Sequence, residues 1–306
     1  MTPDDAWPAL SYEEWAPTLK TLHLHAQMLG KLKLALHPPL PEWLHAGLTL
    51  DARGVSTGPL AGDGRVVDAG IDLFDGVLWV RAADRTAVIA LTGGRPVAEV
   101  WRAFGQALRD LGVAADLWDK PQEMPDETTP LPANEHDRTV DLAHARRLYR
   151  VLATVHGLFD QFRAPFFGRT GVQLWWGAFD LAVLLFSGAQ VTAPDDRGYI
   201  MRYDLDAQHL NAGFWPGNDA APQAVFYAYI HPRPDGCATA AIEPPGAGWV
   251  EALGQWVLSY DDARRSGDPA AAVLGFLRSA YRVALTIGGW DEAAQRYEAP
   301  PPPPRA

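Results

Sequence analysis

The sequence predicts an α+β protein made of two similar halves, a pseudo-duplication in which each half is a helix, a four-strand antiparallel meander and a second helix, packed as one unit. Two observations support this class. Apolar residues recur at helical spacing in four long segments, and short β-like runs bounded by glycine and proline lie between them. A length of 306 residues with 48% hydrophobic residues is enough for a sizeable core.

The first half covers residues 1–118. Ser11 opens a helix over residues 11–36 that ends before Pro38-Pro39. Turn residues such as Asp75-Gly76 then separate four predicted strands, at residues 48–55, 66–74, 77–81 and 87–91. Pro96 begins a second helix, which ends near Gly112.

A linker rich in proline and acidic residues, 119–137, leads to the second half, residues 138–298. Its helices are predicted at residues 140–166 and from Pro269 to Gly288. Its strands are predicted at residues 172–186, 209–215, 224–230 and 256–259. The proline run at 299–306 predicts a disordered tail.

The duplication itself depends on a shift of about 130 residues, which places Gly47 on Gly177 and Gly58 on Gly188. The extra residues of the second half then fall in loop-like stretches, as insertions do. The alternative is that the order of helix, sheet and helix recurs by chance, because α+β arrangements are common.

Charge and cysteine content exclude several classes of function. A net charge of −11 without a basic run disfavours nucleic acid and anionic membrane surfaces as partners. The single cysteine excludes an internal disulfide, and no apolar run approaches the length that spans a bilayer. We therefore expect an acidic, cytoplasmic protein.

The most unusual stretch is residues 174–186, where Asp180 lies inside a long aromatic and aliphatic run. On one continuous strand Trp176 and Asp180 would share a face, and Trp175 would lie on the other. A buried carboxylate needs a partner or a purpose, so Asp180 is a candidate site residue. The alternatives are that the aromatic residues form core, or that Asp180 caps a turn.

A polar stripe on the first helix could supply that partner. Lys20, His23, Gln27 and Lys31 follow one another at spacings of three and four residues. Such a stripe is usually a solvated face, but it could instead face a cleft, with His23 or Lys31 opposite Asp180.

Further rings come from Trp215, Tyr227 and Tyr229 on neighbouring predicted strands. His209 and His231 lie near strand ends and could form part of a metal site if the topology brought them together. We find no phosphate-binding glycine loop, and Pro59 denies the helix that a nucleophile elbow at residues 54–58 would require.

Several motifs resemble a bacterial family known only as a domain of unknown function. They include Thr21-Leu22-His23, Trp176-Gly177, Gly213-Phe214-Trp215-Pro216-Gly217 and Phe226-Tyr227-Ala228-Tyr229. The resemblance spans nearly the whole chain and implies a single evolutionary unit. It implies no activity, substrate or cofactor.

The leading hypothesis is a protein that binds a small apolar or aromatic ligand. Its ligand-binding residues would be Gln27, Trp175, Trp176, Trp215, Tyr227 and Tyr229. If it is an enzyme, Asp180 and His23 would act as acid and base, with Lys31 stabilising negative charge. The alternatives are a protein-interaction module whose aromatic residues are core, and a metal-dependent enzyme using His209 and His231.

Overall fold

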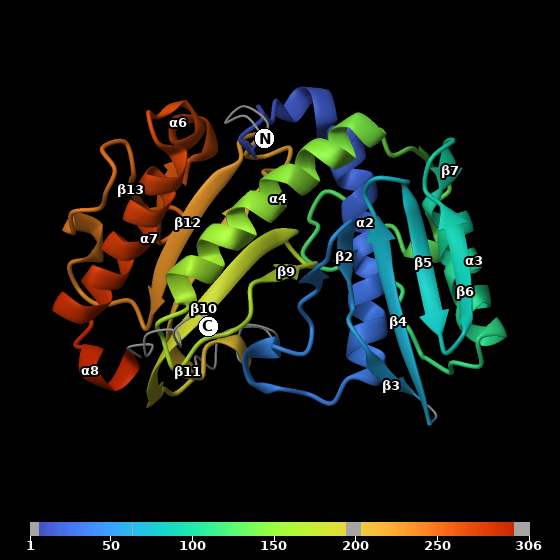
Figure 1. Ribbon diagram of the computed structural model, residues 1–306, viewed down its shortest axis with the longest axis horizontal. Coiled ribbons are helices and arrows are strands. Elements are labelled where there is room, and N and C mark those ends of the chain that lie inside the picture. Colours follow the sequence, from blue (N-terminus) through green and yellow to red (C-terminus); the bar gives the residue numbers. More distant parts are fainter. Residues whose placement is uncertain (1–5, 63, 194–202, 297–306) are drawn as a thin grey trace, which may run out of the picture. The chain divides into compact units, whose positions relative to one another are not determined.

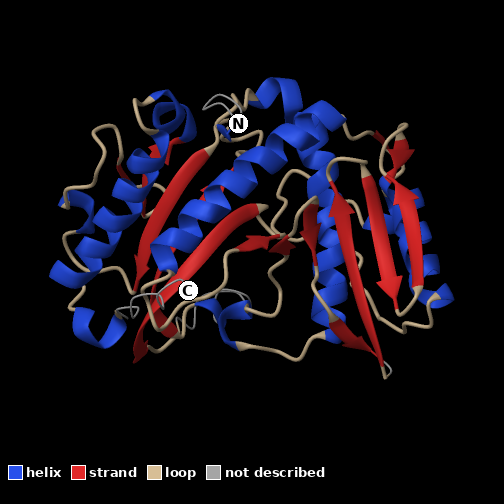
Figure 2. Ribbon diagram, in the orientation of Figure 1, coloured by secondary structure: helices blue, strands red, loops and turns tan. Residues whose placement is uncertain are grey.

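The computed structural model describes residues 6–62, 64–193 and 203–296 and shows an α+β fold with two antiparallel sheets (Figures 1 and 2). The chain forms two compact units. The first contains Met1–His156, Val172–Ala182 and Phe214–Val225, and the second contains Gly157–Gly171, Val183–Gly213 and Phe226–Ala306. The predicted tail at residues 299–306 lies outside the described residues. The duplication and the 119–137 boundary stay predictions.

The first unit is built on one long helix and a six-stranded sheet. Its elements are α2 (Tyr12–Leu36), η1 (Pro41–Trp43), β1 (Thr49–Leu50), β2 (Gly54–Ser56), β3 (Leu60–Gly62), β4 (Arg65–Asp72), β5 (Val77–Ala82), β6 (Arg85–Ala90), β7 (Arg95–Pro96), α3 (Val97–Asp110), η2 (Leu131–Ala133), β8 (Asp137–Arg138) and β9 (Gln173–Trp175). The predicted helices at 11–36 and after Pro96 are confirmed.

The sheet of the first unit has the order β1-β2-β4-β5-β6, with β3 also paired to β4. Helices α2 and α3 cover one face of it (Figure 1). The predicted strand 48–55 is instead two strands, because the Asp51 carboxylate accepts the N–H groups of Arg53 and Gly54, each at 2.8 Å, and so turns the chain. The β4–β5 hairpin turns at Asp75-Gly76 as predicted, with Gly76 at φ 64°.

The second unit contains most of the other sheet. The remaining elements are α4 (Leu142–Arg163), β10 (Asp180–Gln190), β11 (Ala207–Trp215), β12 (Val225–His231), η3 (Cys237–Thr239), β13 (Gly248–Val250), β14 (Gln255–Ser259), α6 (Tyr260–Arg265), α7 (Pro269–Thr286) and α8 (Glu292–Gln295). The strand order is β13-β14-β12-β11-β10-β9. Helix α4 and strands β10, β11 and β12 each have one end in the first unit.

Aromatic packing holds helix α7 within the second unit. Phe166, which follows α4, and Tyr281 of α7 meet edge to face, with ring centroids 4.6 Å apart. Asp268 caps α7 by accepting the N–H of Ala271 at 3.0 Å, which explains why the helix begins at Pro269 as predicted. Among the described helices none combines the length and the apolar character needed to cross a membrane.

The predicted single strand over residues 172–186 is wrong. Strand β9 ends at Trp175, and β10 starts at Asp180, which lies directly opposite Trp175 in an antiparallel pair. A tight turn separates them, closed by a 2.7 Å hydrogen bond from the Phe179 N–H to the Trp175 carbonyl. Trp176 and Asp180 therefore do not follow the alternation of one strand, and Asp180 opens the return strand.

Candidate ligand-binding site

The polar stripe of α2 is solvated only in part: its N-terminal end is partly exposed and its C-terminal end is buried. Gln27 is fully buried and Lys31 is 2% exposed, whereas Lys20 and His23 are partly exposed. Two other segments of the first unit cover the stripe: the turn after β9, residues 176–179, and the segment 118–127. Burial of the stripe follows from the backbone groups that these two segments present to it.

The turn after β9 presents two backbone carbonyls to α2. His23 Nε2 lies 3.0 Å from the Trp176 carbonyl oxygen and 2.9 Å from that of Gly177. Gln27 Nε2 donates to the Trp176 carbonyl at 3.0 Å. The backbone of Phe179 in this turn lies in the left-handed region at φ 63°. This conformation costs free energy for a residue with a side chain.

Trp176 packs directly on the helix. Its indole occupies the space where Gly30 has no side chain, so that a Cβ at Gly30 would lie 2.1 Å from Trp176 Cε2. The indole N–H donates to the Ala46 carbonyl at 3.0 Å, and the residue is 4% exposed. Trp176 is therefore buried and firmly packed between α2 and the segment that contains Ala46.

Lys31 lies at the buried, C-terminal end of the stripe. Its ammonium donates to the Lys120 carbonyl at 2.7 Å and lies 4.9 and 5.3 Å from the ring centroids of Trp118 and Trp176. Burial lowers the pKa of Lys31 to about 8, although nearby Asp119 acts in the opposite direction. Backbone and aromatic rings thus hold this cation in place of a carboxylate.

The segment 118–127 is fixed to α2 by the same stripe. Gln27 donates to the Gln122 carbonyl and accepts the Gln122 N–H, both at 3.0 Å. This pair of bonds uses the donor and the acceptor of one amide against the backbone of one residue. It positions the following residues, Glu123 to Glu127, along the side of a cavity.

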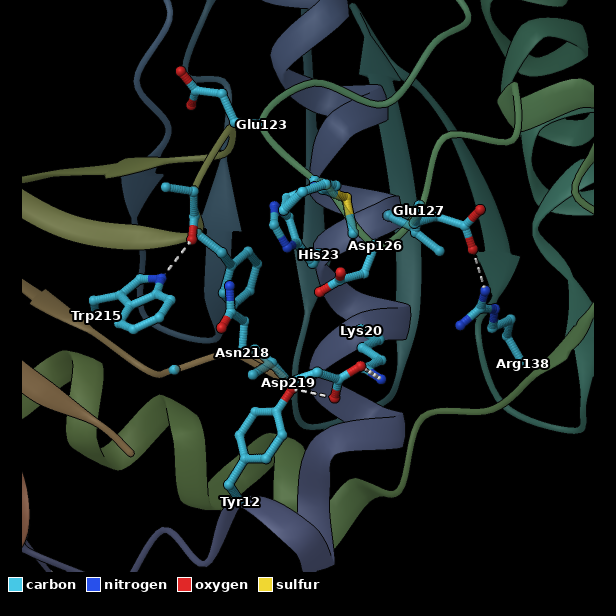
Figure 3. A pocket seen from close by; sticks show the side chains of 17 residues that line it. Tyr12, Lys20, His23, Glu123, Asp126, Glu127, Arg138, Trp215, Asn218 and Asp219 are labelled. Atoms are coloured by element: carbon cyan, nitrogen blue, oxygen red, sulfur yellow. Dashed lines mark hydrogen bonds and ion pairs between the residues drawn. The ribbon is translucent and has the colours of Figure 1, made fainter. Parts of the chain in front are cut away.

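The cavity lies beside the N-terminal half of α2 and has a volume of about 470 Å³ (Figure 3). This volume lies within the range of small-molecule sites. All its lining residues belong to the first unit. The titratable and aromatic ones are Tyr12, Lys20, His23, Glu123, Asp126, Glu127, Arg138, Phe179, Trp215 and Asp219.

Two ion pairs are built into the lining. Lys20 contacts Asp219 at 2.5 Å, and the Tyr12 hydroxyl donates to the same carboxylate at 3.0 Å (Figure 3). The hydrogen bond from Lys20 lowers the pKa of Asp219, while burial and Asp219 together raise the pKa of Tyr12. Arg138 contacts Glu127 at 2.7 Å. Both cations of the lining are thus neutralised by the protein itself.

His23 is neutral at physiological pH. Burial lowers the pKa of His23 to about 4, against the effect of its hydrogen bonds to Gly177 and Trp176. Carbonyls only accept, so the hydrogen lies on Nε2 and Nδ1 carries a lone pair. Nδ1 has no hydrogen-bond partner among the described residues, and the ring lies 5.2 Å from that of Phe179. His23 can therefore accept a hydrogen bond from a bound molecule.

Of the other predicted site residues, Trp215 also lines the cavity, and its indole N–H donates to the Ala178 carbonyl at 3.1 Å. Asp180 is buried at 8% exposure, opposite Trp175 on the neighbouring strand. In the part of the chain that the structure describes, the cavity lining does not include Asp180, Lys31, Gln27, Trp175 or Trp176.

Tyr227 and Tyr229 belong to β12 in the second unit. Their rings stack with centroids 6.5 Å apart, and Asn211 donates to the Tyr229 hydroxyl at 3.0 Å. His209 and His231 do approach each other there, with ring centroids 5.5 Å apart. Within residues 6–62, 64–193 and 203–296, however, no group of three or more His, Cys, Asp or Glu side chains could hold a metal.

Sequence reasoning missed most of the polar lining. Asp126 and Glu127 lie in the predicted linker, which has no periodic pattern, and Asp219 follows the Gly-Phe-Trp-Pro-Gly element. The ion pair between Lys20 and Asp219 joins residues 199 positions apart, so local spacing carries no signal for it. The acidic content of the linker was the one available hint.

Comparison with known proteins gives a family but no activity. Neither the curated proteins nor the solved structures include a significant match to this chain. A family model does match residues 7–297, nearly the whole chain, in agreement with the resemblance noted in the sequence. The chain therefore belongs to DUF5996, a family of unknown function.

Proposed function

We propose that the cavity beside α2 binds a small organic molecule with an aromatic or apolar part. The observation that carries this proposal is the state of His23. One of its nitrogens is committed to two backbone carbonyls, which orients the ring, and the other is an unused acceptor on a side chain that lines a cavity of about 470 Å³. A preoriented acceptor of this kind is typical of the few polar groups that orient a bound ligand.

The rest of the lining supports binding in the same way. Phe179 and Trp215 provide aromatic surface, and Trp215 is held in place by its bond to the Ala178 carbonyl. The ion pairs of Lys20 and Arg138 fix the polar wall without needing a ligand to neutralise them. The cavity is thus largely preformed.

Binding is better supported than proton transfer. A general base works best when its pKa lies near the operating pH, and the pKa of His23 is lowered to about 4. The other two residues of the acid–base hypothesis, Asp180 and Lys31, are not among the described residues that line the cavity. We therefore assign His23 a binding role.

A fragment screen by ligand-observed NMR tests this proposal. Fragments with an aromatic ring are expected to bind the wild-type protein, and His23→Phe should weaken them about 10-fold because it removes the Nδ1 acceptor. His136→Phe, at an exposed histidine outside the lining, is the matched control and should bind as the wild type does.

Thermal unfolding of both variants verifies that they are folded. Binding that is equal in the wild type and in folded His23→Phe would refute a role for His23. A screen without a single hit would refute the cavity as a binding site.

A further inference from the structure

The cavity lining carries a net negative charge, and only some of its carboxylates are paired with a cation. The lining contains four carboxylates, those of Glu123, Asp126, Glu127 and Asp219, and two cationic side chains. Both cations are already paired, Lys20 with Asp219 and Arg138 with Glu127. Arg138 Nε, which has no hydrogen-bond partner, is shut off from solvent and so cannot serve a ligand in the cavity. An anionic ligand would find no unpaired cation among the described lining residues.

The two remaining carboxylates differ in direction. Figure 3 shows Glu123 directed away from the other labelled side chains, and its carboxylate packs so closely on Gly177 that a Cβ there would lie 2.0 Å from Glu123 Oε2. The Asp126 carboxylate instead lies between His23, Asn218 and Asp219 (Figure 3). Within the described chain Asp126 has no ion pair or hydrogen bond. It is a negative charge on the cavity with no counter-charge supplied by the protein.

The neighbours of Asp126 favour the same kind of ligand. Phe179 and Trp215 line the cavity, and aromatic faces attract cations. His23 Nδ1 accepts hydrogen bonds, as a carboxylate does, and cannot donate while the ring is neutral. A protonated amine can satisfy all three kinds of group, because it donates hydrogen bonds, carries a positive charge and can lie over a ring.

We infer that the ligand is an organic cation, a protonated amine joined to an aromatic or apolar group, with its nitrogen between Asp126 and His23 Nδ1 and its apolar part against Phe179 and Trp215. This inference rests on the proposed binding function and adds the charge of the ligand to it.

Three probes of similar size and different charge test the inference: 2-phenylethylamine, 2-phenylethanol and phenylacetate. Isothermal titration calorimetry at neutral pH is expected to show the amine binding at least 10-fold more tightly than the alcohol, and phenylacetate the weakest. Raising the salt concentration should weaken the amine more than the alcohol, because salt screens the charge of Asp126.

Asp126→Asn keeps the size of the side chain and removes its charge. The variant should weaken the amine about 5- to 10-fold and leave the alcohol unchanged. Asp116→Asn, at an exposed aspartate outside the cavity lining, is the matched control and should bind all three probes as the wild type does.

The outcomes separate the two proposals. If the alcohol or phenylacetate binds as tightly as the amine and this binding depends on His23, the cavity is a binding site but the inference about charge is overturned. If the fragment screen yields cavity ligands and none is cationic, the cavity is again a binding site and the inference about charge is again overturned. If the amine binds equally to wild type and Asp126→Asn, the inference is overturned as well. Absence of binding by any probe or fragment overturns both proposals.

Discussion

The two ends of the polar stripe on α2 have the same sequence pattern and opposite environments. Lys20 and His23 border the cavity, and Lys20 pairs with a carboxylate that is partly in water. Gln27 and Lys31, one to two turns further along, are buried against backbone carbonyls and indole rings. The difference shows that polar residues at helical spacing do not by themselves mark a solvated face or a catalytic group. The segments that cover each end decide its role.

The largest expected effect on stability is at Gly30, which lies next to the buried end of the stripe. Gly30→Ala should lower the free energy of unfolding by about 3 kcal/mol, because the new Cβ would lie 2.1 Å from a fully packed indole. Urea unfolding followed by circular dichroism measures this. Gly157→Ala in α4, where nothing lies within 4 Å of the new Cβ, is the control and should gain up to about 1 kcal/mol. A Gly30→Ala protein as stable as wild type would refute the close packing of Trp176.

Lys31 should make the free energy of unfolding rise with pH in the alkaline range. Its folded pKa of about 8 lies below that of an unfolded lysine, so the unfolded chain holds more protons between pH 8 and 10.5 and stability rises with pH in that window. Lys31 should contribute about 2–3 kcal/mol to this rise in the free energy of unfolding. Burial also lowers the pKa of Lys33 to about 8, so Lys33 adds a separate contribution.

Urea unfolding from pH 7 to 10 tests this for Lys31→Met, which should retain packing and lose about half of the rise. Lys20→Met is the control, because Lys20 is partly exposed and ion-paired. An unchanged pH dependence in Lys31→Met would show that this ammonium is well solvated.

His23 should act in the acid range and in the same sense, so that stability again rises with pH. Because its folded pKa of about 4 lies below that of an unfolded histidine, the unfolded chain gains protons first as pH falls below 6.5, and stability decreases down to about pH 4. His23 should account for about 2 kcal/mol of this loss in the free energy of unfolding.

His23→Gln should remove that share when unfolding is measured from pH 7 to 4.5, and His136→Gln should not. His25 and His209, whose pKa values burial lowers to about 3 and about 4, keep part of the slope in both variants. Equal slopes in His23→Gln and wild type would contradict the lowered pKa of His23.

The smallest effect belongs to the solvated end. Asp219→Asn breaks the ion pair with Lys20, whose side chains are 39% and 47% exposed, and should cost about 0.5 kcal/mol. Thermal unfolding at low and high salt measures it, and the difference between variant and wild type should shrink at high salt. A loss of several kcal/mol would mean that the two ends of the stripe do not differ as described.

The contrast also explains which parts were predictable. The long helices and the α+β class follow from local periodicity, and the Asp75-Gly76 turn follows from the conformational freedom of glycine. The β9–β10 turn was missed because the stretch from Leu174 to Phe186 is interrupted only by Gly177 and Asp180, and we interpreted Asp180 as a buried residue of one strand.

Site residues were predictable only where a residue stands out locally. His23 and Trp215 were identified by their spacing and by the aromatic run around them, and both line the cavity. Asp126 and Asp219 reach the cavity through contacts between distant segments, which no local pattern encodes. Asp180 stood out for its apolar neighbours, yet its place was set by strand pairing with Trp175.

The contact between Gly30 and Trp176 has an evolutionary consequence. Each residue occupies space that the other leaves free, although 146 positions separate them in the sequence. A larger residue at the place of Gly30 is tolerable only if the indole is exchanged for a smaller side chain in the same lineage. The two positions should therefore covary across DUF5996, and in an alignment of its members they should form a coupled pair that joins the first helix to the turn after β9.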